Sequence, residues 1–455
     1  MMEGKFMEEK FVDVVVLGDN LTAITSSILL VKRGFSVQRI GEHPVFDQYP
    51  CFPLYHQDAD QGILGSIIKE IDLTIPVKPI NHIDNSFFPD FTWKRTRSLK
   101  EQKNLLLDFF PEYNESINEY FNVIEGLGKE WSILLESNGG LNPKEIPYSI
   151  RYSNLSYVNY IESLFNGNQK LIGILCISLP SSDVALTVMA GYLYGQVFDS
   201  CIIDGGIQRI YQQMENMLRE GNVSLDKPDI PIIITQQNPG YKVQYQKNLA
   251  CFAKCVLDTR GDMQNKSSRL CSDSKLTFLS ILLELKEEIH GIPHTEIWYD
   301  YPDYDLNSYF KRLENGILPT DIAYILWNTH PRMGRAQVEL RIDIPLIALG
   351  DREKYNKIIH QVLEKIEFRI PNLKDKVANI EIFTPEMHAE RTHLSDGSGT
   401  RWAFSVKQVF KNPMKLEVAP KYFSTHDWGF AWFSVAYIAA NQITAKLKNV
   451  KESMR

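Results

Sequence analysis

Residues 11–40 read FVDVVVLGDNLTAITSSILLVKRGFSVQRI and have the pattern of a strand, a helix and a second strand. The valine-rich run of residues 11–17 lacks a period of 3.6, which is typical of a strand buried on both faces. Residues 21–33 then carry apolar side chains at helical spacing, Gly34 ends this helix, and residues 35–40 form a second strand. Because one βαβ unit is the minimum for a parallel sheet, the stretch predicts an α/β lobe.

The composition limits the class of protein. The chain has 455 residues, 44% of them hydrophobic, and this length favours more than one lobe around separate cores. The formal net charge is -7 and no basic block offsets it, so we expect no nucleic-acid partner. The start, MMEGKFMEEK, lacks the apolar core of a signal peptide, and no stretch reaches about 18 consecutive apolar residues. These features predict a cytoplasmic protein.

The cysteines and histidines do not predict a metal site or a disulfide framework. The six cysteines are scattered through a long chain, which favours reduced thiols in cores. His290 and His294 have zinc-like spacing, but a glycine and a proline between them prevent one helix from presenting both on one face. We therefore predict no metal.

Farther along the chain, helical and strand patterns alternate in long blocks. Residues 97–135 are amphipathic and helical, and residues 207–219 form another helix after the run Asp-Gly-Gly. Strand patterns follow this second helix and fill residues 275–345, and residues 353–368 return to a clear helix. No internal repeat or low-complexity linker separates the blocks, so we expect lobes that are interleaved along the chain.

The turn after the first strand keeps part of a dinucleotide-binding fingerprint. In that fingerprint the first glycine makes the turn, the second lets a pyrophosphate approach, and the third lets the helix pack on the strand. Gly18 keeps the first position, and Ala23 is an accepted substitute at the third. Asn20 takes the second position, where its amide either crowds a phosphate or donates a hydrogen bond to it.

The helix start and the end of the second strand complete this candidate site. A helix that begins near Leu21 and Thr22 offers unpaired N–H groups and a positive dipole end to an anion. The residue expected to bind a ribose falls on Gly41, and Glu42 follows it as the nearest carboxylate. The alternative is a structural βαβ unit that holds no ligand.

Five segments in order resemble the phytoene desaturase family, which includes carotenoid desaturases and isomerases and is similar to retinol saturases. They cover nearly the whole chain: the first βαβ unit and residues 202–222, 316–331, 355–373 and 381–399. The resemblance implies a discontinuous FAD-binding lobe, a second lobe with a tunnel for a long apolar substrate, and contact with a membrane surface. The glycine-rich, arginine-containing loop of the family is absent after the second strand, where the chain reads EHPVFDQYPCFPLYHQ.

The resemblance also implies positions for further binding residues. It places Gly205 and Gly206 close to the cofactor, although a plain helix entry capped by Asp204 explains them as well. In residues 421–443 it places Asp427, Trp428 and Gly429 at the flavin, whereas the alternative is that the aromatic side chains there fill the flavin's space. Three residues are candidates for lining the substrate pocket, and no catalytic residue is assigned: Thr384, Pro385 and Arg391.

These features together predict a mixed α/β fold with two interleaved lobes. We expect a Rossmann-like FAD-binding lobe from residues 8–75, 195–272 and 378–455, and a second lobe of helices and antiparallel sheet from 76–194 and 273–377. The function implied by the resemblance is an FAD-dependent oxidoreductase of desaturase, saturase or isomerase type, with an apolar cavity between the lobes for a polyene or lipid-like substrate.

The altered fingerprint predicts that FAD binds weakly and is partly or wholly absent after purification. The alternative is a relative without flavin that acts as a lipid- or partner-binding module, as the Rab escort and dissociation-inhibitor proteins of this superfamily do.

Overall fold

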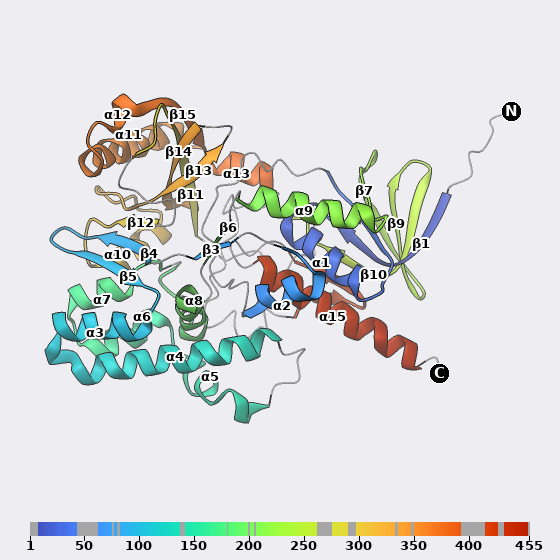
Figure 1. The fold of residues 1–455 in the computed structure, drawn as a ribbon, viewed down its shortest axis with the longest axis horizontal. Coiled ribbons are helices and arrows are strands. Elements are labelled where there is room, and N and C mark those ends of the chain that lie inside the picture. The colour runs from blue at the N-terminus through green and yellow to red at the C-terminus, as the bar shows by residue number, and fades with distance from the viewer. Residues whose placement is uncertain are drawn as a thin grey trace.

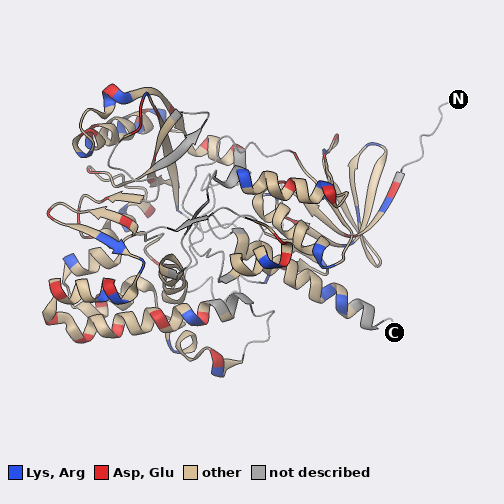
Figure 2. Ribbon diagram, viewed as in Figure 1, with Lys and Arg blue, Asp and Glu red and all other residues tan. Residues whose placement is uncertain are grey.

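The computed structural model contains two large sheets, each with its own helices (Figure 1). Figure 2 shows that residues of both charge signs are interspersed over the helices and strands that it colours. The structure describes residues 8–42, 62–74, 77–79, 82–136, 142–179, 181–198, 201–203, 206–261, 275–289, 297–332, 335–346, 350–392, 415–425 and 432–453.

The first sheet has a parallel core of five strands. Their spatial order is β17 (Tyr422–Ser424), β10 (Leu249–Asp258), β1 (Glu8–Leu17), β2 (Val37–Ile40) and β7 (Leu225–Asp226). Strand β16 (Glu417–Ala419) adds to one edge antiparallel, and the hairpin of β8 (Ile233–Gln237) and β9 (Gly240–Gln246) pairs with the first half of β10. Residues Val14 to Leu17 have 0% exposure, as predicted for a strand covered on both faces.

Helices and the hairpin cover the two faces of this sheet. Four helices build one core: α1 (Leu21–Lys32), α2 (Gly62–Ile71), α9 (Gly206–Glu220) and α15 (Trp432–Ser453). Helix α1 packs against the other three as well as the sheet, so its residues 21–30 are all buried. A second core lies between the β8–β9 hairpin and the sheet, where Val15 and Leu17 pack with Tyr245.

The second sheet has seven strands in the order β15, β11, β14, β13, β12, β4, β5. Every neighbouring pair is antiparallel except β4 and β12, which run parallel. Helix α11 (Arg352–Arg369) packs on this sheet through Tyr355, Ile358 and Val362. The strand bounds are β4 His82–Phe87, β5 Thr92–Thr96, β11 Leu276–Leu285, β12 Ile297–Asp300, β13 Tyr324–Arg332, β14 Arg335–Pro345 and β15 Val377–Phe383.

A helical block lies beside the β4, β5 and β12 end of the second sheet and shares a core with it. Its helices are α3 (Leu99–Phe109), α4 (Asn114–Glu136), α5 (Pro147–Tyr152), α6 (Tyr157–Phe165), α7 (Gln169–Leu175), α8 (Leu186–Phe198) and α10 (Leu306–Glu314). The remaining elements are the pair β3 (Val77–Pro79) and β6 (Cys201–Ile203) and the helices α12 (Leu373–Lys376) and α13 (Pro385–Thr392).

The fold is therefore a mixed α/β fold with a Rossmann-like parallel sheet. The chain visits the first sheet in residues 8–40, 225–258 and 417–424, and visits the second sheet between these visits. Strand β15 departs from the predicted boundary at residue 378, because it pairs with β11 and so lies in the second sheet. Among the helices of the described residues, none is both long and apolar enough to cross a lipid bilayer.

Candidate functional site

The carboxyl ends of the parallel strands meet at one edge of the first sheet. This edge is formed by the residues that end β1, β2, β10 and β17, namely Leu17, Ile40, Asp258 and Ser424. The chain leaves β1 through α1 to β2 on one side, whereas β10 lies on the other side of β1. In open α/β sheets, ligands bind outside the carboxyl ends of the strands at the point where the strand order reverses. The strand order reverses between β1 and β10 here, so the space outside the carboxyl ends of these two strands is the expected ligand position.

Gly18 makes the turn that leaves β1. Its φ is +113°, a conformation that residues with a side chain rarely adopt, and its N–H donates to Ile40 O at 2.9 Å. A Cβ atom at this position would lie 2.3 Å from Thr259 Oγ1. Only glycine meets both conditions, so the first position of the predicted fingerprint has the geometry that the fingerprint requires.

Asn20 caps α1 and also reaches the neighbouring strand end. Its Oδ1 accepts a hydrogen bond from the Ala23 N–H at 2.9 Å, and its Nδ2 donates to Thr259 O at 2.8 Å. Leu21 and Thr22 begin the helix as expected, and Ala23 is fully buried in the core beneath it. The close packing expected of the third position is thus present, whereas both polar ends of the Asn20 amide already bind protein atoms.

The end of β2 lies against the Gly18 turn. The Gly41 N–H donates to Asp226 O at 3.0 Å, and a Cβ at residue 41 would lie 3.0 Å from Gly18 C and 3.1 Å from Gly18 O. A side chain at residue 41 would therefore press on the turn. Glu42, the next residue, is exposed and is the first carboxylate after β2.

Asp258, Thr259 and Arg260 also lie at this edge, although no sequence motif predicted a role for them. Asp258 is fully buried and binds Arg260 through two contacts, Nε to Oδ1 at 2.9 Å and Nη2 to Oδ2 at 2.7 Å. The hydroxyl of Tyr422 donates to Asp258 Oδ2 at 2.6 Å. Burial lowers the pKa of Arg260, but the bonds and charge of Asp258 outweigh it, so the pKa is raised overall. The signal in the sequence was a charged run, DTRGD, directly after a buried strand.

A second buried ion pair joins β2 to α9. Arg39 has 0% exposure, and its Nη1 lies 2.7 Å from Glu215 Oε1. The Tyr211 hydroxyl donates to the same carboxylate oxygen at 3.0 Å. Burial raises the pKa of Tyr211, the Arg39 charge lowers it, and the net pKa lies above its usual value. The ion pair therefore holds α9, which begins at Gly206, against β2, which ends just before Gly41.

The other predicted binding residues are only partly described. Gly206 is the first residue of α9, whereas Gly205, Asp427, Trp428 and Gly429 lie outside the residues that the structure describes. The N–H of Thr425, two residues before Asp427, donates to Asp258 O at 2.9 Å. Thr425, the last described residue before Asp427, therefore lies at the same sheet edge as Gly18.

The predicted pocket residues belong to the second sheet and its following helix. Thr384 follows β15, and its Oγ1 accepts from the Met387 N–H at 3.4 Å, while Pro385 is buried and begins α13. Arg391 lies in the last turn of α13. In Figure 1, this helix lies on the side of the second sheet that faces the first lobe. These three residues thus lie in or directly before one helix, α13, which is a different element from those of the Gly18 edge.

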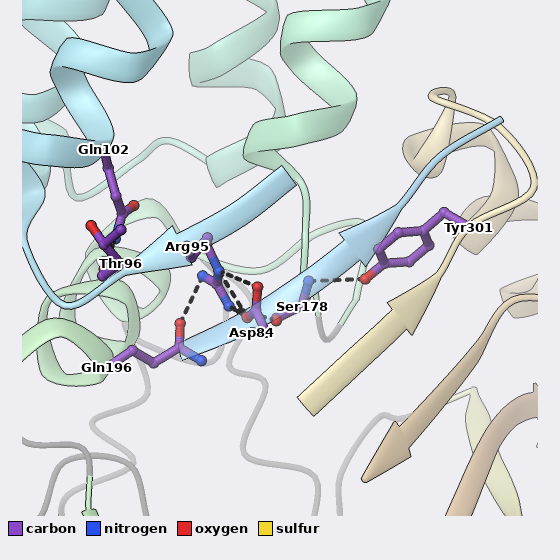
Figure 3. A network of polar contacts seen from close by, with 7 residues as sticks. All are labelled: Asp84, Arg95, Thr96, Gln102, Ser178, Gln196 and Tyr301. Carbon is purple, nitrogen blue, oxygen red and sulfur yellow. Dashed lines mark hydrogen bonds and ion pairs between the residues drawn. The ribbon is translucent and has the colours of Figure 1, made fainter. Parts of the chain in front are cut away.

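A polar network is buried in the second lobe (Figure 3). Arg95 on β5 binds Asp84 on β4, with Nε at 3.0 Å from Oδ1 and 2.8 Å from Oδ2. The guanidinium also donates to Gln196 Oε1 on α8 at 2.9 Å and to Ser178 Oγ at 3.1 Å, and the Ser178 N–H donates to the Tyr301 hydroxyl at 3.1 Å. Burial lowers the pKa of Arg95, but the charge and the hydrogen bonds of Asp84 raise it by more, so the pKa of Arg95 lies above its usual value. The network joins the helical block to the second sheet.

Comparisons with known proteins identify relatives by fold. No family model and no curated protein matches the sequence. An oxidoreductase from Methanosarcina mazei has a TM-score of 0.59 at 13% identity, covering 96% of this chain and 100% of its own. Putrescine oxidase bound to putrescine has a TM-score of 0.57 at 12% identity, covering 98% and 100%. The Rab GDI of Plasmodium falciparum has a TM-score of 0.51 at 13% identity, covering 97% and 98%.

These identities show a shared fold and no more. This chain shares its fold with oxidoreductases such as putrescine oxidase. The comparisons do not show the finer prediction, membership of the phytoene desaturase family.

Proposed function

We propose that the chain is an FAD-dependent oxidoreductase that holds its flavin weakly. The observation that carries the proposal is the Gly18 turn, which leads from the central strand of a Rossmann-like sheet into the N-terminus of α1 at the switch point. Helix N-termini at such switch points bind the pyrophosphate of dinucleotides. The structural likeness to oxidoreductases over nearly the whole chain supports the same proposal.

The described residues fit the adenosine diphosphate part of FAD at most of the required points. Gly18 leaves the turn without a side chain, Ala23 lets α1 pack closely, and the N-terminus of α1 lies at the switch point. The exposed carboxylate of Glu42 would bind the ribose, because residue 41 has little room for a side chain. Asn20 is the point of poor fit, since its amide is bound to Ala23 and Thr259.

FAD supplies the hydride chemistry when it is bound, and the protein supplies binding and orientation. We place Gly206 and the segment of Asp427, Trp428 and Gly429 at the flavin. Two contacts support this: the Arg39–Glu215 ion pair ties α9 to β2, and the Thr425 N–H donates to Asp258 O at the Gly18 edge. Thr384, Pro385 and Arg391 would line the substrate side. The paired groups Asp258 and Arg260 fix the strand end beneath the cofactor and need not take part in chemistry.

For the substrate we propose a bulky apolar polyene or lipid-like molecule, acted on by a desaturase, saturase or isomerase reaction. The five segments that resemble the phytoene desaturase family support this class, and an apolar substrate of that size would reach the protein from a membrane surface. An amine is the competing class, because putrescine oxidase shares the fold.

The alternative function is a binding module without flavin. Two observations favour it: Asn20 already occupies the α1 N-terminus, and a Rab GDI has the same two-lobe fold at a TM-score of 0.51. Fold alone does not decide between an enzyme and a binding module.

The deciding experiment is a flavin titration of the purified protein. We expect a colourless or partly loaded protein that gains a flavin absorption band and quenches FAD fluorescence as FAD is added, with exchangeable binding. One tightly held flavin per chain as isolated would contradict weak binding and strengthen the enzyme proposal. A protein that stays colourless at saturating FAD would favour the binding module. Substrate class is then tested by adding a polyene, a fatty acyl chain or an amine to the loaded protein, and only the first two classes fit the proposal. A desaturase substrate reduces the oxidised flavin, a saturase substrate reoxidises a flavin that dithionite has reduced, and an isomerase substrate changes its own double-bond geometry with no net change of the flavin.

A further inference from the structure

The side chain of Asn20 joins the start of α1 to the end of β10. We call its two hydrogen bonds, to the Ala23 N–H and to Thr259 O, the Asn20 clasp. The clasp links the chain just after the carboxyl ends of β1 and β10, the switch point to which the proposed function assigns the FAD pyrophosphate.

The far end of the clasp is rigid. Thr259 is fully buried, and both its N–H and its Oγ1 donate to Leu17 O, at 2.8 Å and 2.9 Å. Its Oγ1 also lies where a side chain on Gly18 would begin. Because Thr259 is held to β1, it would stay in place if the start of α1 moved. Moving the start of α1 away from the end of β10 therefore requires breaking the hydrogen bond from the Asn20 amide to Thr259 O.

The near end of the clasp uses a donor that an anion would need. The first N–H groups of a helix have no partner within the helix and are the groups that bind a phosphate. Asn20 Oδ1 accepts from one of them, Ala23 N–H. A pyrophosphate that approaches the start of α1 must compete with this carboxamide for the same donor.

We infer that the Asn20 clasp stabilises a closed form of the flavin-free protein, and that FAD binds only after the Asn20 side chain has rotated away from Thr259. The inference rests on the proposed function, since it concerns the same switch point. It makes Asn20 a positioning residue that sets FAD affinity without contributing to the reaction. Replacing Asn20 with glycine should therefore tighten FAD binding while it destabilises the flavin-free protein.

The test compares Asn20→Gly with the wild-type chain in two measurements, FAD affinity by fluorescence titration and the melting temperature without FAD. We expect Asn20→Gly to bind FAD about tenfold more tightly, the effect of about one lost competing hydrogen bond, and to melt at a lower temperature. Asn168 gives a matched control, because it caps α7 in the second lobe by accepting from the Leu171 N–H at 3.0 Å. Asn168→Gly should also lower the melting temperature but leave FAD affinity unchanged.

A second variant covers the case in which Asn20→Gly does not fold. Asn20→Ser keeps an N-cap acceptor but is too short to reach Thr259, so it should bind FAD more tightly than wild type with a smaller loss of thermal stability. Unchanged or weaker FAD binding in both variants would overturn the clasp, since the Asn20 amide would then be neutral or itself a ligand contact. That result leaves the proposed function standing if wild type binds FAD. Failure of wild type and both variants to bind FAD overturns the proposed function and the clasp together.

Discussion

Gly18 is constrained both by its backbone conformation and by a close contact. We predict that Gly18→Ala lowers the free energy of unfolding by about 2 to 5 kcal/mol, because a left-handed backbone costs a side-chain residue about 1–2 kcal/mol and an overpacked contact about 1–3 more. The overpacked contact is Thr259 Oγ1, which would lie 2.3 Å from the new Cβ. Urea unfolding followed by circular dichroism measures the change.

Gly34 provides the control for this prediction. Its φ is +83°, but a Cβ there meets nothing within 4 Å, so Gly34→Ala should show only the backbone cost of about 1–2 kcal/mol. Adding Thr259→Ala to Gly18→Ala should recover part of the loss. Equal losses in the two glycine variants would mean that Thr259 does not constrain the turn.

A second prediction at this scale concerns the buried pair of Arg95 and Asp84. Arg95→Met should lower the free energy of unfolding by about 3–5 kcal/mol, because it leaves the fully buried Asp84 without its counter-charge. The double change Arg95→Met and Asp84→Leu should recover most of this loss, since both charges are then gone. Chemical unfolding of the three variants measures the effect, and a double variant as unstable as Arg95→Met would contradict it.

Single residues also show what the sequence could and could not reveal about the site. Gly18 and Ala23 were predicted because a local spacing rule gives each of them a role in one turn. Thr259 lies 239 positions from Asn20, so no local pattern could reveal the clasp. Arg39 was missed because an arginine within a strand predicts an exposed side chain, whereas here Glu215 of α9 compensates its charge.

At the scale of elements, Glu417 connects the β16–β17 turn to α15. Its Oε1 accepts from the Lys421 N–H at 2.8 Å and lies 2.9 Å from Lys446 Nζ. Burial raises the pKa of Glu417, but these two partners outweigh it and lower the pKa below its usual value of 4.5. A carboxyl whose pKa is lowered by folding stabilises the protein above the unfolded-state pKa, and this contribution is lost as the pH falls through the lowered value.

We therefore predict that Glu417→Gln lowers the melting temperature at pH 7, and that the difference from wild type shrinks as the pH falls below about 4.5. Calorimetry between pH 7 and pH 3.5 measures it. Glu220→Gln, at an exposed position at the end of α9, should change the melting temperature little at any pH. A difference for Glu417→Gln that stays constant over this range would show that its carboxylate charge does not matter.

Elements with a strong local period were predicted correctly. The βαβ unit, α9 and α11 match their expected ranges, and the helical stretch 97–135 divides into α3 and α4 at Pro111. The pairing of strands that lie far apart in the sequence was harder to predict. The parallel contact of β4 with β12 and the place of β15 beside β11 depend on packing across the sheet, which the period of one strand does not encode.

At the scale of the whole molecule, the two lobes have separate cores. Two apolar clusters consist of residues from the first sheet, its helices and their connections, and the other two consist of residues from the second sheet, its helices and their connections. We predict that FAD raises the melting temperature of the first lobe and leaves the second nearly unchanged, because a ligand stabilises only the unit that holds it. At 100 times the dissociation constant the gain is about 2.7 kcal/mol.

Hydrogen exchange measured by mass spectrometry tests this prediction. With FAD present, peptides from β1 and β10 should exchange more slowly, and those from β11 and β14 should keep their rates. Calorimetry should show unfolding that departs from a single two-state transition. Uniform protection of both lobes would show that they unfold as one unit.

The interleaved path of the chain has a consequence for how the protein is made. Six helices of the helical block, α3 to α8, lie in the continuous stretch of residues 99–198, so they can begin to pack while the ribosome is still adding residues. The first lobe cannot be completed at that stage, because β1 pairs with β10, and α1 lacks its packing against α15 until that helix has been synthesised more than 400 residues after α1 begins. The residues of α1 that pack against α15 in the folded protein stay exposed over that interval. Chaperones that bind apolar segments would therefore have long access to residues 11–40, because packing partners of this stretch are made several hundred residues later.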